Sequence, residues 1–356
     1  MGELRLMKGN EAIAEAAIRA GLDAYFGYPI TPQSEVLEYL TLQRPEERTG
    51  MVVLQAESEV AAINMVYGAA GTGKKVMTSS SSPGISLKQE GISYIAGAEL
   101  PCLIVNVVRG GPGLGTIQPS QADYFQSTKG GGHGDYRLFV LAPASVQEMA
   151  DFVDKAMEIA FKYRNPVMIL SDGLIGQMME KVELPPQKER VSTFDQSWVT
   201  TGKTKDRERN IITSLNLDPE KQYQHNLKLQ EKYNSMKQDV MYESFYCDDA
   251  EFLLVAYGSS ARICQKAVDV ARSRGKKLGL LRPITLFPFP DEIIAKLSRQ
   301  VKGILSVELN AGQMVEDVRL AVNGRIPVYH YGTPGGKIYS PDDVLKAIEE
   351  KLLGGY

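Results

Sequence analysis

The sequence of 356 residues contains little cysteine and histidine, with three residues of each. Cys102, Cys247 and Cys264 stand far apart and fit neither a disulfide framework nor the spacing of metal ligands, so we expect each to be a buried apolar residue. An iron–sulfur cluster normally takes four clustered thiolates, which excludes a cluster held by this chain alone. The histidines are also scattered, and the sequence therefore predicts no self-contained zinc site.

Long apolar runs and a strong net charge are missing as well. No stretch approaches the roughly 18 unbroken apolar residues that a membrane-spanning helix requires. The first residues lack a cationic segment followed by an apolar run, so we expect no secretory signal and a cytoplasmic location. The net charge is −3, which leaves no basic field for a nucleic-acid backbone. With 43% hydrophobic residues, the chain is expected to be globular.

The length favours two domains, because single cores stop growing efficiently at about 250 to 300 residues. In residues 1–180, helical and strand patterns alternate strictly, which is typical of α/β proteins with a doubly wound parallel sheet. Residues 181–248 are polar and include the amphipathic stretch HNLKLQEKYNSMKQDV, which begins at His225; we expect a linker that packs across the first domain. The alternation resumes in residues 249–356, which predicts a second, smaller α/β domain.

The stretch FGYPITPQSEV, residues 26 to 36, predicts a strand that stops at Pro29 and a helix that starts just after Pro32. Thr31 is expected at the N-cap and Pro32 at the first helical position, where its missing N–H costs nothing. A helix that begins at the carboxyl end of a strand directs free N–H groups into the crevice above the sheet, which suits a carboxylate or a phosphate. The same two residues are equally typical of a plain helix cap.

Two more features stand at the carboxyl ends of predicted strands, where open α/β sheets place ligands. Glu57 and Glu59, in QAESEVAAIN, begin a helix, where acidic residues are favoured by the helix dipole whatever their function. Arg109 ends the apolar strand PCLIVNVV and opens the loop GGPGLGTIQPSQADY. A guanidinium at this point could hold a carboxylate through two hydrogen bonds, or it could form a surface ion pair.

The stretch GAAGTGKK, residues 68 to 75, matches the phosphate-binding loop except at its last position, where Lys75 replaces the hydroxyl that binds magnesium. It also follows a helix and opens a strand, which reverses the required order. We interpret Gly71 and Gly73 as the end of a helix. A nucleotide-binding regulator, which would depend on this stretch, is the alternative from another functional class. The serines of TSSSSPG that follow are predicted to end a strand, either in a turn that lines a ligand site or in a plain loop.

The sequence resembles the alpha subunit of the 2-oxoacid:ferredoxin oxidoreductases in four stretches. They occur in the order YPITP, ESEVAAINMVYGAA, TSSSSPG and VVRGGPGLGT. The resemblance extends through VAYGSSARI, LRPITLFPFP and VELNAGQM in the second domain. It is greatest for the branched-chain type, which acts on 3-methyl-2-oxobutanoate (2-ketoisovalerate) and is similar in SWVTTG and HNLKLQEKY. It implies a thiamine-diphosphate pyrimidine-binding first domain and a second domain like the carboxyl-terminal domain of transketolase.

The family implies a role for each candidate residue. Glu59 would hydrogen-bond N1′ of the pyrimidine and favour the imino tautomer, which takes the proton from the thiazolium carbon. Thr31 and Arg109 would hold the substrate carboxylate. Pro29 and Tyr28 would lie against the cofactor.

The resemblance also implies that the chain holds only half of an active site and is inactive alone. The diphosphate and its Mg²⁺ need an acidic, Asn-containing motif that SDG at 171 to 173 does not supply, so these ligands would come from a beta subunit. Iron–sulfur clusters would belong to other subunits, with gamma and ferredoxin-like delta subunits expected, coenzyme A as co-substrate and ferredoxin as electron acceptor. The alternatives are the same complex acting on 2-oxoglutarate or pyruvate, and the beta chain of a lipoamide-linked branched-chain dehydrogenase.

Overall fold

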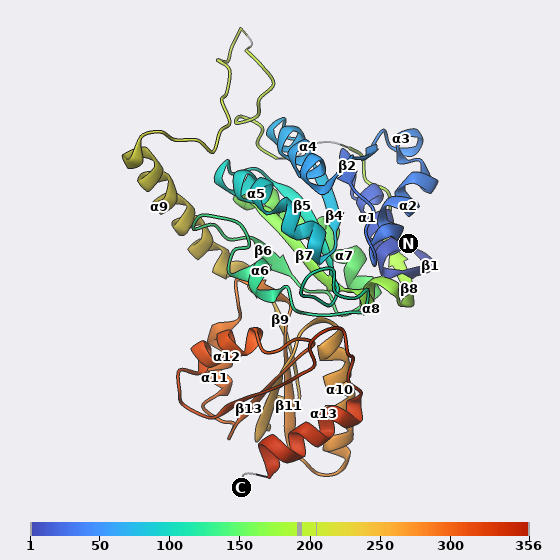
Figure 1. Ribbon diagram of the computed structural model, residues 1–356, viewed down its shortest axis with the longest axis vertical. Helices are drawn as coiled ribbons and strands as arrows, with labels where there is room; N and C mark the ends of the chain where they lie inside the picture. The colour runs from blue at the N-terminus through green and yellow to red at the C-terminus, as the bar shows by residue number, and fades with distance from the viewer. Residues whose placement is uncertain (1, 191–193, 204, 355–356) are drawn as a thin grey trace.

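The computed structural model describes residues 2–190, 194–203 and 205–354. Two α/β units lie one above the other along the long axis (Figure 1), and the chain passes from the first into the second through a long segment that contains α9. The described residues leave out 1 and 355–356, at the outer ends of the predicted domains. They also leave out 191–193 and 204, in the predicted linker.

A seven-stranded sheet forms the centre of the first unit, in the order β12-β6-β7-β5-β4-β2-β3. All its strands run parallel except β12, which lies antiparallel to β6 at one edge. The predicted doubly wound parallel sheet is therefore confirmed. Its strands are β2 (Ala24–Gly27), β3 (Val52–Gln55), β4 (Val76–Ser80), β5 (Cys102–Val108), β6 (Phe139–Leu141), β7 (Pro166–Asp172) and β12 (Thr285–Phe287).

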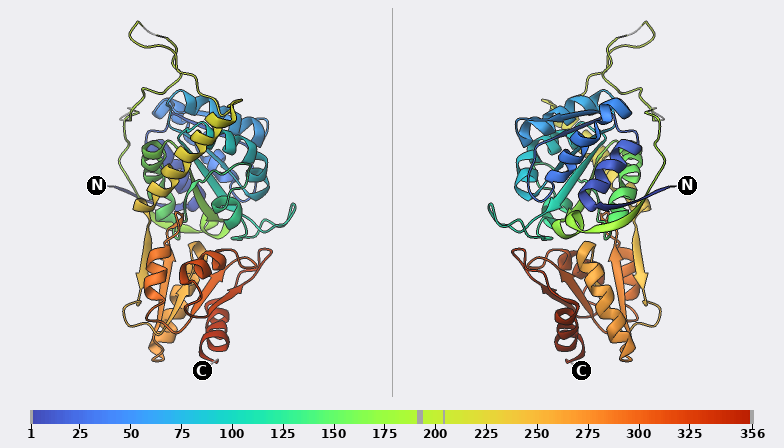
Figure 2. Two further views of the ribbon diagram at one scale, coloured as in Figure 1. Left: turned by 90° about the vertical axis from the view of Figure 1, so that its left-hand side faces the viewer. Right: turned by 90° about the vertical axis from the view of Figure 1, so that its right-hand side faces the viewer.

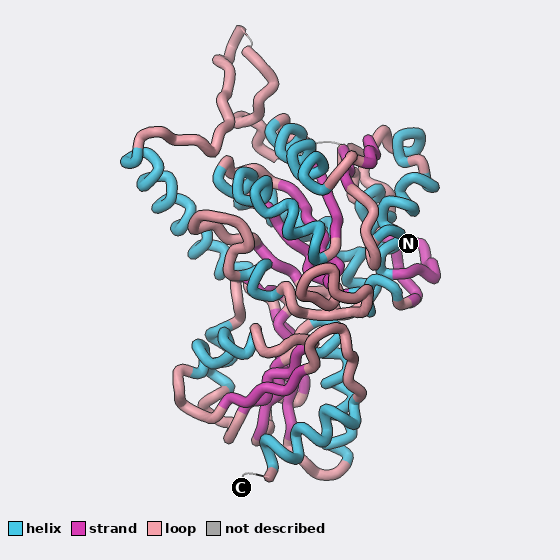
Figure 3. Tube along the Cα trace, in the orientation of Figure 1, coloured by secondary structure: helices cyan, strands magenta, loops and turns pink. Residues whose placement is uncertain are grey.

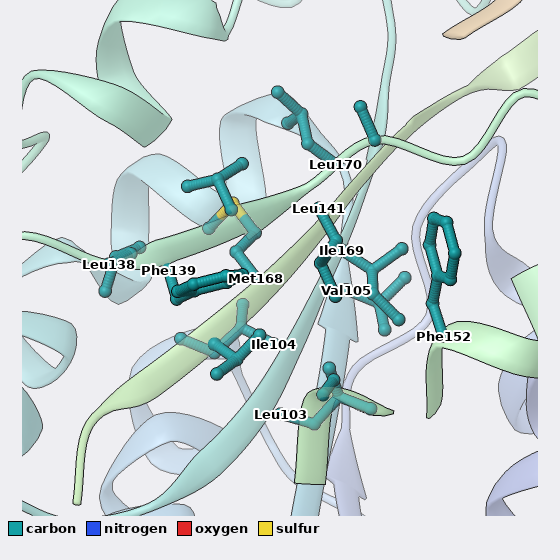
Figure 4. Close-up of a cluster of buried hydrophobic side chains, with 14 of the residues drawn as sticks. Leu103, Ile104, Val105, Leu138, Phe139, Leu141, Phe152, Met168, Ile169 and Leu170 are labelled. Carbon is teal, nitrogen blue, oxygen red and sulfur yellow. The ribbon is translucent and has the colours of Figure 1, made fainter. Parts of the chain in front are cut away.

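Helices cover both faces of this sheet (Figure 1, Figure 3), with α4 and α5 packed together on one face and α1 and α7 on the other. Because both faces are covered, β5 and β7 are buried along their whole length and consist mostly of apolar residues. Figure 4 shows part of this core, where Ile104, Phe139 and Met168 come from three neighbouring strands. The helices are α1 (Gly9–Arg19), α2 (Ser34–Gln43), α3 (Pro45–Arg48), α4 (Glu59–Gly71), α5 (Ser82–Gly97), α6 (Tyr124–Thr128), α7 (Val146–Tyr163) and α8 (Gly173–Gln177).

The second unit has a five-stranded sheet in the order β14-β13-β10-β11-β9, which is parallel except for β9 at its edge. Helices α10 and α13 pack together beside this sheet, and α11 packs against α12. Its strands are β9 (Tyr242–Phe245), β10 (Phe252–Val255), β11 (Leu278–Pro283), β13 (Ile304–Glu308) and β14 (Val328–Gly332). Its helices are α10 (Gly258–Ser273), α11 (Asp291–Leu297), α12 (Met314–Val322) and α13 (Pro341–Ile348), which continues as a π-helical turn, η2 (Glu349–Leu353).

The segment between the sheets contains more structure than the sequence indicates. Strand β8 (Met179–Leu184) pairs antiparallel with β1 (Glu3–Lys8) in a separate two-stranded sheet. The predicted amphipathic helix is α9 (Pro219–Ser235), which begins before His225 and is followed by a 3-10 turn, η1 (Met236–Asp239). It lies across the first unit, where the ring of His225 and the backbone oxygen of Gly97 are 2.7 Å apart.

Two edge strands cross the predicted domain boundaries. Strand β9, from the predicted linker, joins the second sheet, and β12, from the predicted second domain, joins the first. Both are antiparallel additions of only three or four residues that cover an otherwise open sheet edge. The boundaries at 180 and 248 stay a prediction.

A buried polar interface joins the two units. The side chain of Gln121 donates to the backbone oxygen of Tyr257 at 2.9 Å and accepts from the Ser260 hydroxyl at 2.6 Å and from the Leu309 N–H at 3.0 Å. The Ser259 hydroxyl donates to Asp172 at 2.5 Å. Because buried amide and carboxylate groups are costly to leave unpaired, these bonds fix how the units meet.

Two expectations about individual residues are confirmed. The cysteines are all free and buried. Helix α4 ends at Gly71, and Gly73 follows in the left-handed region with a φ of 77°. None of the described helices is both long enough and apolar enough to cross a membrane.

Candidate functional site

Four loops meet above the carboxyl ends of neighbouring strands in the first sheet. They follow β2, β3, β4 and β5 and carry the candidate residues. The chain passes from β2 outward to β3 and then returns to the opposite side of β2 at β4, so the order of the sheet reverses between β2 and β4. Open α/β sheets bind ligands in the crevice at such a switch point. The topology therefore supports a site where the sequence predicts one.

Arg109 follows β5, and its side chain joins two of these loops. Nη1 donates to the backbone oxygen of Thr31 at 2.9 Å and Nη2 to that of Leu114 at 3.1 Å. The Ser82 hydroxyl accepts from the Arg109 backbone N–H at 3.1 Å, which fixes the start of the Gly-rich loop. Arg109 is only 9% exposed, and its Nε has no partner among the described residues. The guanidinium therefore still has donors to offer a ligand.

Thr31 lies directly beside Arg109 and has an exposed side chain. The structure thus brings together the two residues that were predicted to hold a carboxylate, although the role itself stays a prediction. The Gly-rich loop, residues 110–118, projects from the molecule next to them and is the teal loop at the right of the left-hand view in Figure 2. A loop from the second unit reaches it, since Gly335 and Gly336 approach Gly110 closely.

The prediction that Thr31 caps a helix is wrong. Helix α2 begins at Ser34 with Gln33 at the N-cap and no side-chain capping bond, and Pro32 lies outside the helix. The reason is tertiary: the backbone oxygen of Pro32 accepts from Asn10 at 2.7 Å and from Gln177 at 2.9 Å. These bonds hold the YPITP stretch as a loop. The hydroxyl of Thr31 is consequently not used by α2.

A buried row of polar side chains lies under this loop, and the sequence analysis did not single it out. Gln33 Oε1 accepts from the Ser79 hydroxyl at 2.5 Å, and Ser79 and the Tyr25 hydroxyl are 2.7 Å apart. Gln33 Nε2 donates to the backbone oxygen of Tyr28 at 3.2 Å. Burial raises the pKa of Tyr25 to about 12, so its hydroxyl stays neutral. In the sequence, the serine run TSSSSPG was the one feature that pointed to this buried row, and nothing there singled out Gln33.

Glu59 is the first residue of α4 and is 7% exposed. Ser58 caps the helix by accepting from the Ala61 N–H at 3.2 Å, so Glu59 is not needed as the cap. Its carboxylate lies against the first turn of α5, where Oε1 is 2.8 Å from the position that a Cβ on Gly84 would occupy. Glu57 is exposed. Of the two glutamates, only Glu59 is therefore buried beside the switch point.

The other two residues expected near the cofactor lie on the same loop as Thr31. Tyr28 is half-buried and Pro29 is exposed. Neither makes a side-chain hydrogen bond among the described residues. Their role beside the cofactor therefore stays a prediction.

The first turn of α5 connects the two parts of the site. Ser82 holds the backbone of Arg109, and two residues later Gly84 contacts Glu59. Arg109 and Glu59 therefore lie on two sides of one helix N-terminus, which is the positive end of the helix dipole. Ser80 and Ser81, just before this turn, are fully buried, and their hydroxyls have no partner within the described parts of the chain.

On the role that the resemblance implies for Glu59, Gly84→Ala is expected to lower turnover of the complex by about 10²-fold, the effect of roughly 1 Å of misplacement in a catalytic group. The added Cβ would lie 2.0 Å from Ser80 Oγ and 2.8 Å from Glu59 Oε1, so the carboxylate must move. Steady-state kinetics measure the loss. Gly303→Ala in the second unit is the matched control, since the nearest atom there would be 3.4 Å away, and its turnover should be unchanged. Equal turnover in the two variants would contradict the tight contact.

Comparison with known families gives matches over nearly the whole chain. The family model described as "Pyruvate flavodoxin/ferredoxin oxidoreductase, thiamine diP-bdg" matches residues 15–243. The model described as "Pyruvate:ferredoxin oxidoreductase core domain II" matches residues 250–344. The first match contains β2 to β7 of the first sheet, and the second contains β10, β11, β13 and β14 of the second sheet together with β12.

Curated relatives include the ketoisovalerate oxidoreductase subunit VorB of Methanothermobacter marburgensis, which is 51% identical over 97% of this chain and 97% of its own. The 2-oxoglutarate synthase subunit KorA of Archaeoglobus fulgidus is 35% identical, over 98% of this chain and 100% of its own. Among solved structures, the 2-oxoglutarate:ferredoxin oxidoreductase of Magnetococcus marinus, with 2-oxoglutarate, coenzyme A and succinyl-CoA bound, superposes with a TM-score of 0.86 at 26% identity. That match covers 98% of this chain and 65% of the other, so this chain spans just under two thirds of that structure's chain.

Proposed function

Because this chain belongs to the 2-oxoacid:ferredoxin oxidoreductase family, we propose that it is the subunit carrying the pyrimidine end of the thiamine diphosphate site. The reaction is the oxidative decarboxylation of a branched-chain 2-oxoacid, 3-methyl-2-oxobutanoate, with coenzyme A, to acyl-CoA and CO₂. Electrons pass to ferredoxin. The observation that carries the proposal is the 51% identity, over 97% of both chains, to a ketoisovalerate oxidoreductase subunit.

The sequence identities to the two kinds of relative favour a branched-chain substrate over 2-oxoglutarate. Identity is 51% to the ketoisovalerate subunit and 35% to the 2-oxoglutarate subunit, with similar coverage. A single methylene changes selectivity by only about 1 to 3 kcal/mol in a hydrophobic pocket. Overall similarity therefore supports the substrate class, and an assay has to establish the acid.

The residues at the switch point fit the pyrimidine end of thiamine diphosphate. Glu59 is a buried carboxylate at a helix N-terminus, beside Gly84 and the hydroxyl of Ser80, which has no hydrogen-bond partner among the residues that the structure describes. Such a group can accept a hydrogen bond from a ring nitrogen. The cofactor supplies a nucleophilic carbon and an electron sink when it is bound. Tyr28 and Pro29, on the neighbouring loop, are proposed to pack against it.

Thr31 and Arg109 are proposed to hold the substrate carboxylate. The guanidinium is kept in place by the backbone oxygens of Thr31 and Leu114, so it need not reorganise when the acid arrives. A carboxylate that leaves as neutral CO₂ has to be oriented without being over-stabilised. One arginine with two of its donors already occupied, together with one exposed hydroxyl, suits that requirement.

A partner subunit is proposed to complete the site and to hold the diphosphate and Mg²⁺. Apolar side chains are exposed on β3, α4 and α5, the elements that surround Glu59, and exposed apolar groups in such numbers are typical of an interface. They are Val52, Leu54, Val60, Met65, Leu87 and Tyr94. Iron–sulfur clusters are assigned to other subunits, the beta subunit among them, and gamma and ferredoxin-like delta subunits are proposed as further partners. The free, buried cysteines favour a reducing, cytoplasmic location.

Reconstitution with the neighbouring subunits tests the proposal. The complex should reduce ferredoxin or a low-potential viologen when it receives 3-methyl-2-oxobutanoate, coenzyme A and thiamine diphosphate, and this chain alone should not. Parallel assays with 2-oxoglutarate and pyruvate determine the substrate. Activity that requires lipoamide would instead identify a lipoamide-linked dehydrogenase.

A further inference from the structure

The loop between β2 and α2 is held from beneath by Gln33, whose side chain is fully buried. This loop, residues 28–32, carries three of the candidate site residues. The backbone N–H of Gln33 donates to the backbone oxygen of Ile30 at 2.9 Å, and its Nε2 donates to that of Tyr28 at 3.2 Å. One residue therefore closes the loop on itself with two hydrogen bonds.

The amide of Gln33 has a fixed orientation, because its oxygen is used on the other side. The Ser79 hydroxyl donates to Gln33 Oε1 at 2.5 Å, and the hydroxyl oxygens of Ser79 and Tyr25 are 2.7 Å apart. A serine hydroxyl has a single proton to donate, so Tyr25 is the donor in the second contact. The bonds run in one direction, from β2 through β4 to the amide of Gln33. They turn its N–H group toward the backbone oxygen of Tyr28.

The structure makes room for this row at Gly27. A Cβ at that position would lie 2.2 Å from the Tyr25 hydroxyl oxygen, so glycine lets the tyrosine reach Ser79. Buried hydroxyl and amide groups are costly to leave unpaired, and here each one is bonded to the next. An apolar side chain in place of Gln33 would fill the same space without directing a donor at the loop.

Other side chains hold the rest of the loop backbone. The backbone oxygen of Thr31 accepts from Arg109 at 2.9 Å. The backbone oxygen of Pro32 accepts from Asn10 at 2.7 Å and from Gln177 at 2.9 Å. The loop is thus fixed through its backbone oxygens, which leaves its side chains available to a ligand.

We propose that Gln33 is a positioning residue, which sets the conformation of the loop that presents Thr31 to the substrate carboxylate. The same backbone bonds place Tyr28 and Pro29 for the cofactor. The inference rests on the proposed function, in which these three residues touch substrate and cofactor, whereas Gln33 acts through the loop backbone. Because the bonds are already formed in the protein alone, the loop need not be ordered when a ligand binds, and such preorganisation favours binding.

The decisive experiment compares Gln33→Met with Asn165→Leu in the complex assembled with the partner subunit. Both changes replace a fully buried amide by an apolar side chain of similar size. Asn165 lies just before β7, at the amino end of the sheet, and donates to the backbone oxygens of Arg137 and Pro166 at 3.0 Å. It therefore matches Gln33 in burial and bonding but lies at the end of the sheet away from the site.

We expect Gln33→Met to lower kcat/KM for the 2-oxoacid, per bound thiamine diphosphate, by up to about 10²-fold, the effect of roughly 1 Å of misplacement. The loss should be mainly in KM, because Thr31 is proposed to hold the carboxylate. Asn165→Leu should keep the wild-type kcat/KM even where its melting temperature falls as far.

Ser79→Ala tests the same row by a smaller change. Gln33 keeps its bond to Tyr28 in this variant but loses the bond that orients its amide, so the loss of kcat/KM should be smaller. Added to Gln33→Met, Ser79→Ala should cause little further loss, since residues that act as one unit are not additive. Full additivity of the two changes would overturn the inference.

Hydrogen exchange gives a readout that does not depend on turnover. The amides of residues 28–33 should exchange faster in Gln33→Met and at the wild-type rate in Asn165→Leu. If the wild-type complex shows no thiamine-dependent turnover of a 2-oxoacid, the proposed function fails, and faster exchange would still support the hold of Gln33 on the loop. If the wild type is active and Gln33→Met keeps its kcat/KM, or Asn165→Leu loses as much, the inference is overturned.

Discussion

Glu59→Gln is expected to lose about 10²- to 10⁴-fold of the turnover of the assembled complex, the range for removal of a group that takes part in proton transfer. Glutamine has the same shape but presents an amide, which is a poorer acceptor than a carboxylate and brings two donors of its own. The fold should survive, because Ser58 and not Glu59 caps α4. Turnover and cofactor affinity should be measured separately on the same preparation.

Glu57→Gln is the matched control for this experiment. Glu57 lies two residues away on the same loop, but its side chain is exposed. Its replacement should leave turnover close to that of the wild type. If Glu57→Gln were inactive and Glu59→Gln active, the catalytic assignment would pass to Glu57.

Arg109→Lys is expected to lower kcat/KM for the 2-oxoacid by about 10- to 100-fold, which corresponds to one hydrogen bond to a charged group. Lysine keeps the charge but not the planar fork that now reaches the backbone oxygens of Thr31 and Leu114. The loss should be mainly in KM. Steady-state kinetics with varied 2-oxoacid measure it.

The control for Arg109→Lys is Arg274→Lys, at the exposed end of α10 in the second unit. Exposed ion pairs contribute little, so this variant should keep the wild-type kcat/KM. A hydrogen-exchange comparison of residues 110–118 adds a readout that does not depend on activity. The amides of this loop should exchange faster in Arg109→Lys, since the hydrogen bond from the guanidinium to the backbone oxygen of Leu114 is lost. An unchanged KM together with a loosened loop would assign Arg109 to loop structure alone.

The sequence was sufficient to predict the alternation of strands and helices, because long apolar runs such as β5 are specified by burial on both faces. It was also sufficient to predict that candidates at strand ends would converge, since carboxyl ends of parallel strands share one edge. The start of α2 was missed because it is decided by Asn10 and Gln177, side chains that are distant in sequence and hold Pro32 outside the helix. Local preference could not reveal those partners.

Short edge strands and buried polar residues were missed for a similar reason. Strands β9 and β12 have three or four residues and take their conformation from the sheets that they join, so they carry no strong pattern of their own. Lys88 looks in the sequence like any lysine on an amphipathic helix. Only the packing of α4 against α5 shows that it points inward.

The segment from Arg109 to Gln121 is anchored at its two ends to different bodies. One end is tied to the loops of the first sheet through Thr31, and the other is clamped to the second unit by Tyr257, Ser260 and Leu309. A rotation of the second unit would therefore displace the segment that begins at Arg109, the residue proposed to hold the substrate carboxylate. The second unit contributes none of the proposed reacting groups, yet through this segment its orientation would affect how the proposed carboxylate site is held.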